Sequence, residues 1–128
     1  MSKTVLLVDD DPIFMEMAAS LLSSQRGATV LRAHNGKEAL RQIDSSAEAI
    51  SLIVCDLNMP EADGVEVLLE LGRRRVETPI VLITGAVPAV VKSAEILARA
   101  HGLNVLNLLI KPVHARQLAL TFDKALAA

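Results

Sequence analysis

Five side chains that could carry chemistry stand at or just after the ends of short apolar runs. Asp9 and Asp10 follow the first run, and Asp56 ends the run that begins at residue 52. Thr84 and Lys111 close the last two runs. Three carboxylates that share a small space repel one another, and a bound cation relieves that repulsion. Because oxygen ligands select hard ions, the cation expected here is Mg²⁺.

The same side chains suit phosphoryl transfer. With a cation present, the carboxylate of Asp56 can act as a nucleophile towards phosphorus and form an aspartyl phosphate. The hydroxyl of Thr84 and the ammonium of Lys111 are groups that bind phosphoryl oxygens and neutralise developing charge. We therefore expect phosphoryl transfer onto Asp56, provided that the fold brings the ends of the runs together.

The hydrophobic pattern predicts an alternation of strands and helices. Short aliphatic runs indicate buried strands, and apolar residues at three- and four-residue spacing indicate helices with one buried face. Asp11 before Pro12 is typical of a helix start, and Gly27 of a helix end. The predicted strands are 4–8, 28–33, 51–55, 80–83 and 104–110, and the helices begin near residues 12, 36, 64, 88 and 113.

Five strand–helix pairs without an intervening linker predict one α/β domain over residues 1–128, with an open, doubly wound parallel sheet and helices on both faces. Functional sites in such sheets lie at the carboxyl ends of the strands. Asp9, Asp10, Asp56, Thr84 and Lys111 are therefore expected to share one crevice.

Composition excludes several classes of protein. The net charge is −2 without a basic run longer than three residues, and Phe14 and Phe122 are the only aromatic residues, so neither duplex nor single-stranded nucleic acid is an expected partner. No apolar run approaches the roughly 18 residues of a membrane span, and the apolar run near the amino terminus is too short for a signal peptide. These features predict a cytoplasmic protein without membrane contact.

Several polar residues have a simple structural interpretation. Asp11 is expected to cap a helix, and Cys55, the single cysteine, to be an inert core thiol without a disulfide or a cysteine-based metal site. The basic run at 73–75 is expected to be a solvated helix end rather than a phosphate site. The three histidines lack metal-ligand spacing and are expected in loops or caps: His34, His101 and His114.

Four short motifs together resemble the receiver domain of two-component response regulators. The likeness covers essentially the whole chain and implies a flavodoxin-like fold with strand order 2-1-3-4-5. The motifs are Val8-Asp9-Asp10-Asp11-Pro12, Asp56-Leu57-Asn58-Met59-Pro60 with Asp63-Gly64, Thr84-Gly85, and Lys111-Pro112.

The resemblance also implies roles for individual residues. Asp56 would accept a phosphoryl group from a sensor histidine kinase or a phosphotransfer protein. Asp10 and Asp56 would bind Mg²⁺ directly, Asp9 through water and Asn58 through its backbone carbonyl. The domain would catalyse its own phosphorylation and slow dephosphorylation without being a turnover enzyme.

Further expectations follow from the resemblance, except that the surface of the homodimer is inferred because Thr84 and Lys111 border it. Thr84 and Lys111 would bind the phosphoryl oxygens, Thr84 would move inward on activation, and Pro112 would follow a cis peptide bond. A homodimer would form through the fourth helix, the fifth strand and the last helix. A weaker likeness of residues 97–106 to receivers fused to EAL-type cyclic-di-GMP phosphodiesterase domains implies such an output domain outside this chain.

Two departures from the family pattern bear on the switch. Receivers usually carry Tyr or Phe three residues before the lysine, where this chain has Leu108. Ala86, two residues after Thr84, offers no acid or amide to position a hydrolytic water. Leu108 therefore leaves open an alternative, a degenerate receiver that acts as a phosphorylation-independent docking or dimerisation module.

A second alternative is a Mg²⁺-dependent hydrolase that uses Asp56 as a covalent nucleophile. An aspartate phosphatase would need a second carboxylate two residues after the nucleophile, and that position is Asn58. The sequence therefore favours a phosphorylatable switch over a hydrolase.

Overall fold

The computed structural model describes residues 3–46, 49–59, 63–85 and 88–127. Five parallel strands form one sheet in the order β2-β1-β3-β4-β5, as expected, with β2 and β5 at its edges. The strands are β1 (Thr4–Val8), β2 (Thr29–Ala33), β3 (Leu52–Asp56), β4 (Ile80–Thr84) and β5 (Val105–Ile110). The helices are α1 (Pro12–Ser20), η1 (Leu21–Gln25), α2 (Gly36–Ser46), α3 (Asp63–Arg73), α4 (Pro88–Ala100) and α5 (Ala115–Ala125).

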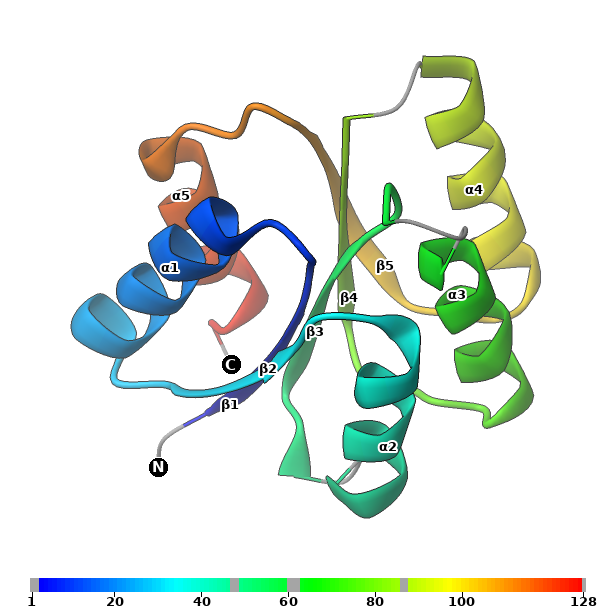
Figure 1. Ribbon diagram of the computed structural model, residues 1–128, viewed down its shortest axis with the longest axis horizontal. Coiled ribbons are helices and arrows are strands. Elements are labelled where there is room, and N and C mark those ends of the chain that lie inside the picture. Colours follow the sequence, from blue (N-terminus) through cyan, green and yellow to red (C-terminus); the bar gives the residue numbers. More distant parts are fainter. Residues whose placement is uncertain (1–2, 47–48, 60–62, 86–87, 128) are drawn as a thin grey trace.

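Helices cover both faces of the sheet. Figure 1 shows α1 and α5 on one side and α2, α3 and α4 on the other. Alternate residues of a strand point to opposite faces, so a strand buried on both faces supplies two cores. In β1, Val5 and Leu7 belong to the core under α1 and α5, whereas Leu6 and Val8 belong to the other core. The central strands are therefore fixed from both sides.

The first helix begins as predicted and ends differently. One carboxylate oxygen of Asp11 accepts hydrogen bonds from the backbone N–H groups of Ile13 and Phe14, which makes Asp11 the N-cap. The helix then widens into the π-helical segment η1, for which the sequence offers no signal. Gly27 follows with a φ of 63°, a left-handed conformation that glycine adopts without steric cost.

Arginine side chains at the end of α3 form ion pairs within α3 and with α2. Arg75 has a positive φ, and its N–H donates to the carbonyl of Gly72, so the helix stops before the predicted residue 75. Arg73 pairs with Glu70, and Arg74 pairs with Glu70 and with Asp44 of α2. Arg73, Arg74 and Arg75 are exposed, as expected of a solvated helix end, and Arg74 in addition links α2 to α3.

Other boundaries differ from the predicted ones by one or two residues. Asp56 belongs to β3 itself, and the Lys111–Pro112 peptide bond is cis, as the resemblance implied. Within the described residues, no helix is both long and apolar enough to cross a membrane.

Candidate functional site

The carboxyl edge of the sheet gathers the predicted residues. Asp9 directly follows β1, Asp56 and Thr84 end β3 and β4, and Lys111 directly follows β5. Asp9, Asp56 and Thr84 are buried. Carboxylate oxygens of Asp9, Asp10 and Asp56 lie within 4.8 Å of one another, and Asp10 is exposed to solvent. Parallel strands thus bring together the residues that the sequence predicted to share one site.

Lys111 lies at the centre of this acidic group. Its Nζ is 3.0 Å from Asp9 Oδ2 and 3.3 Å from Asp56 Oδ2. A longer ion pair of 3.7 Å joins it to Asp11 Oδ2. The backbone N–H of Lys111 donates to the carbonyl of Thr84 at 2.8 Å, which fixes the start of the side chain. The ammonium therefore compensates the carboxylates in this conformation.

The backbone around Asp56 is held on both sides. Asp56 Oδ1 accepts a hydrogen bond of 2.8 Å from the N–H of Asn58, and the N–H of Leu57 donates to the carbonyl of Ile83 at 2.8 Å. Gly64, in the first turn of α3, lies directly against this segment. A Cβ at Gly64 would be 2.5 Å from Leu57 Cα and 2.6 Å from the carbonyl oxygen of Asp56. Only glycine permits this approach.

Burial and charge shift the acidity of the site. The pKa of Asp9 is raised to about 6, chiefly by burial and further by Asp56, although the hydrogen bond from the Asp11 N–H and the positive charge of Lys111 oppose the rise. For Lys111, burial alone would lower the pKa, but Asp9 and Asp56 outweigh it, and the pKa is raised. The lysine therefore stays cationic, whereas the carboxyl group of Asp9, with its pKa of about 6, titrates at mildly acidic pH when no metal is bound.

The donor set fits Mg²⁺. Asp9 Oδ2 is buried, and its contact with Lys111 is an ion pair without hydrogen-bond geometry. A buried carboxylate oxygen without a hydrogen bond is an energetic cost that a cation can offset. With Asp10 and Asp56, it offers the oxygen ligands that Mg²⁺ prefers. The predicted role of the Asn58 carbonyl stays a prediction.

Two contacts at the site were not anticipated. Asp11, expected only as a cap, also pairs with Lys111 through its second oxygen. The ring of Phe14 lies 5.0 Å from Lys111 Nζ. Asp11 could have been found because it lies three residues beyond a strand end, but the helical position of Phe14 gives no sign of a lysine that is distant in sequence.

Two predicted features relate to the switch. Leu108 in β5 is half-buried and packs against the core that α2, α3 and α4 cover. Ala86 lies outside the described residues, as does the segment 60–62 of the motif that follows Asp56.

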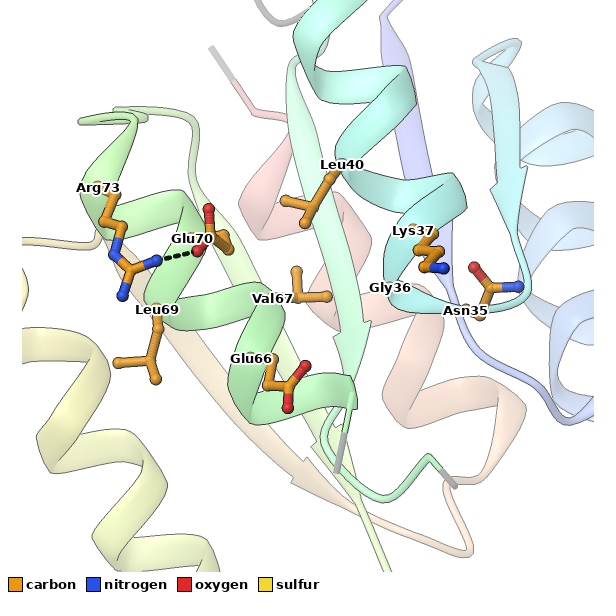
Figure 2. Close-up of a pocket in the computed structure, with 9 residues that line it drawn as sticks. All are labelled: Asn35, Gly36, Lys37, Leu40, Glu66, Val67, Leu69, Glu70 and Arg73. Atoms are coloured by element: carbon orange, nitrogen blue, oxygen red, sulfur yellow. Dashed lines mark hydrogen bonds and ion pairs between the residues drawn. The ribbon is translucent and has the colours of Figure 1, made fainter. Parts of the chain in front are cut away.

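A separate hollow of about 740 Å³ lies between α2 and α3. Figure 2 shows the ion pair between Glu70 and Arg73 on the α3 side of this hollow. No strand-end residue lines it, so the candidate site and the hollow are distinct. Its lining residues are Asn35, Gly36, Lys37, Leu40, Glu66, Val67, Leu69, Glu70 and Arg73.

Residues 5–123 match the family described as the response regulator receiver domain. The chain belongs to this family. The receiver domain is 32% identical over 124 residues to the transcriptional regulatory protein GlrR of Escherichia coli K12, covering 95% of this chain and 26% of that protein. It is 34% identical over 123 residues to the positive alginate biosynthesis regulatory protein of Pseudomonas aeruginosa, covering 94% and 46% of the two chains. The receiver domain thus spans about a quarter to a half of these relatives.

Solved structures share the fold. A response regulator from Colwellia psychrerythraea superposes with a TM-score of 0.80 at 27% identity, covering 97% of this receiver domain and 96% of that chain. A CheY-like receiver domain protein from Methanospirillum hungatei superposes with a TM-score of 0.82 at 24% identity, covering 99% of this receiver domain and 95% of that chain. The flavodoxin-like fold predicted from the sequence is confirmed.

Proposed function

We propose that this receiver domain is a phosphorylation-dependent signalling switch that accepts a phosphoryl group on Asp56. The carrying observation is the position of Asp56 Oδ2, 3.3 Å from the ammonium of Lys111 and within the cluster formed with Asp9 and Asp10. The ammonium is suited to bind the negatively charged oxygens of a phosphoryl donor, and the carboxylate beside it is suited to attack the phosphorus.

The proposed reaction transfers phosphorus from nitrogen to oxygen. A carboxylate oxygen of Asp56 attacks the phosphorus of a phosphohistidine on a sensor kinase or phosphotransfer protein. The P–N bond breaks, its electron pair leaves with the donor imidazole, and that ring takes up a proton from solvent. The product is an acyl phosphate on Asp56, which makes the receiver a reactant as well as the catalyst of the step.

The residues of the chain bind the transferred group. The ammonium of Lys111 exchanges its contact with Asp56 for a contact with a phosphoryl oxygen, and the hydroxyl of Thr84 binds another. Asp9, Asp10, Asp56 and the Asn58 carbonyl would hold Mg²⁺, which would supply positive charge to stabilise the negative charge of the reacting group. Thr84 is already buried at the end of β4, so its proposed inward movement starts from inside the site.

The proposed output surface lies on α4, β5 and α5. Four of the five exposed large apolar side chains among the described residues lie there, and β5 is an edge strand. Exposed apolar residues in one region are typical of an interaction site, and a two-fold dimer pairs the same surface of each copy. We assign this surface to a second copy of the chain. The four residues are Ile96, Leu106, Ile110 and Leu120.

The dimer assignment is tested by light scattering with and without beryllofluoride and Mg²⁺. A dimer that forms on addition and is lost in Leu106→Lys supports it. A monomer in both conditions contradicts it, as does a dimer that Leu106→Lys leaves intact.

The wider context of the receiver is also a proposal. The names of its relatives describe regulatory proteins, GlrR a transcriptional one, and the receiver spans only part of their length, so an output domain joined to this receiver is in keeping with them. The EAL-type output domain and the cytoplasmic location stay predictions from the sequence.

Acetyl phosphate with Mg²⁺ provides the decisive test of phosphorylation. Intact mass spectrometry should show a gain of one phosphoryl group that is absent from Asp56→Asn and from samples containing EDTA. No gain in the wild-type protein would favour the alternative that Leu108 suggests, a docking module that works without phosphorylation. A gain that persists in Asp56→Asn would place the acceptor elsewhere.

A further inference from the structure

The ring of Phe14 contacts the central cation of the site. The ring centroid lies 5.0 Å from Lys111 Nζ, within the range in which the face of an aromatic ring attracts an ammonium group. Among the described residues this is the one cation–π contact. The chain has only two aromatic residues, and one of them is placed against this lysine.

The position of Phe14 is fixed by the site itself. Asp11 Oδ1 accepts from the N–H of Phe14 at 3.4 Å and from that of Ile13 at 3.0 Å, while Asp11 Oδ2 faces Lys111 at 3.7 Å. One carboxylate therefore orients both the helix turn that carries the ring and the ammonium in front of it.

Packing holds the ring in place. Phe14 is 5% exposed and belongs to the core under α1 and α5, together with Leu109 and Val113, which lie two residues to either side of Lys111. The ring thus forms an apolar wall next to a lysine whose side chain is 21% exposed. Water is excluded from the part of the lysine that this wall covers, which strengthens the nearby ion pairs.

A lysine side chain needs such support. Its ammonium sits on a flexible four-carbon stem, so ion pairs alone leave it several conformations. We propose that Phe14 is a positioning residue whose ring holds the Lys111 ammonium against Asp9 and Asp56, where it can meet the incoming phosphoryl oxygens. The effect on phosphoryl transfer rests on the proposed function, whereas the contact between ring and ammonium does not.

Three variants distinguish the effect of the aromatic ring from the effect of a large apolar side chain. Phe14→Leu removes the aromatic face and keeps an apolar side chain, and Phe14→Tyr keeps the face. Phe122→Leu is the matched control because Phe122 is a buried phenylalanine of the same core, in α5. A purely structural role for Phe14 predicts that Phe14→Leu and Phe122→Leu behave alike.

The first measurement is the NMR signal of the Lys111 side chain, assigned by comparison with Lys111→Arg. An aromatic ring shifts protons above its face to higher field, so the Lys111 Cε protons should be shifted relative to those of exposed lysines. The shift should persist in Phe14→Tyr and Phe122→Leu and vanish in Phe14→Leu. Its absence from the folded wild-type protein would overturn the proposal.

The second measurement is the rate of phosphorylation by acetyl phosphate with Mg²⁺. We expect Phe14→Leu to be about two- to fivefold slower, in keeping with one cation–π contact, and the other two variants to match the wild type. Equal rates in all variants would overturn the positioning role, as would equal losses in Phe14→Leu and Phe122→Leu.

The two proposals fail in different ways. A wild-type protein that takes up no phosphoryl group contradicts the proposed function. In that case the contact between Phe14 and Lys111 is still decided by the NMR shift and its loss in Phe14→Leu.

Discussion

Lys111 Nζ and Asp9 Oδ2 form an ion pair of 3.0 Å inside the cluster that would bind Mg²⁺. The ammonium therefore competes with the metal for the same carboxylates. Replacing the lysine by an uncharged residue removes the competitor, and binding of the divalent ion should strengthen.

Lys111→Gln is accordingly expected to bind Mg²⁺ several-fold more tightly than the wild type, because the substitution removes a positive charge that repels the divalent ion, an effect that solvent screens at a partly exposed side chain. Isothermal titration at constant ionic strength measures the change. Lys111→Arg, which keeps the charge, serves as the control. Unchanged or weaker binding in Lys111→Gln would show that the lysine does not compete with the metal.

Asp9 makes the stability of the metal-free protein depend on pH. Its pKa is raised to about 6 from 3.8, so between these values the folded protein binds more protons than the unfolded chain. Stability should therefore rise as the pH falls from 7.5 to 5, by about 1–1.5 kcal/mol. Urea unfolding in EDTA at several pH values measures this.

Asp9→Asn should abolish most of that dependence. The pKa values of Asp44 and Glu70 are lowered by Arg74, so the stability that depends on these two carboxylates is lost mainly below pH 5. Their titration therefore does not mask the effect of Asp9. A wild-type protein that becomes less stable from pH 7.5 to 5 would contradict the interpretation of Asp9.

Gly64→Ala should destabilise the domain and disturb the site. The new Cβ would lie 2.5 Å from Leu57 Cα, so α3 or the Asp56 segment must move, at a cost of about 1–3 kcal/mol. Gly85→Ala is the matched control, since its Cβ would meet its nearest neighbours, Asn58 and Lys111, at 3.9 Å. Urea unfolding of both variants should separate them clearly, and equal stabilities would show that the approach of α3 is not constrained.

Leu108→Tyr tests how the site communicates. The contacts of Lys111 in the site are with residues other than Leu108, so the phosphorylation rate of the variant should stay within about twofold of that of the wild type. Amide chemical-shift changes in α4 on addition of beryllofluoride should become larger, because a ring can exchange between exposed and buried positions. Shift changes equal to those of the wild type would indicate that Leu108 does not limit the switch.

The sequence predicted those features of the site that follow from topology. Parallel strands place Asp9, Asp56 and Thr84 on one edge whatever the details of packing, so the crevice could be inferred from the run ends alone. Contacts between side chains of separate elements could not, because they depend on how α1 settles on the sheet. Phe14 and Lys111 are such a pair. The π-helical segment η1 and the close approach of Gly64 likewise depend on packing rather than on local pattern.

The hydrogen bond from the Lys111 amide to the Thr84 carbonyl joins the two residues proposed to bind the phosphoryl group. It also joins the end of β4 to the start of the loop after β5, the outermost strand on that side of the sheet. A shift of the Thr84 backbone must therefore either stretch this hydrogen bond or move the carboxyl end of β5 with it. The chemical event at Asp56 would then reach the edge strand of the sheet through one backbone hydrogen bond, without requiring any rearrangement of the two cores.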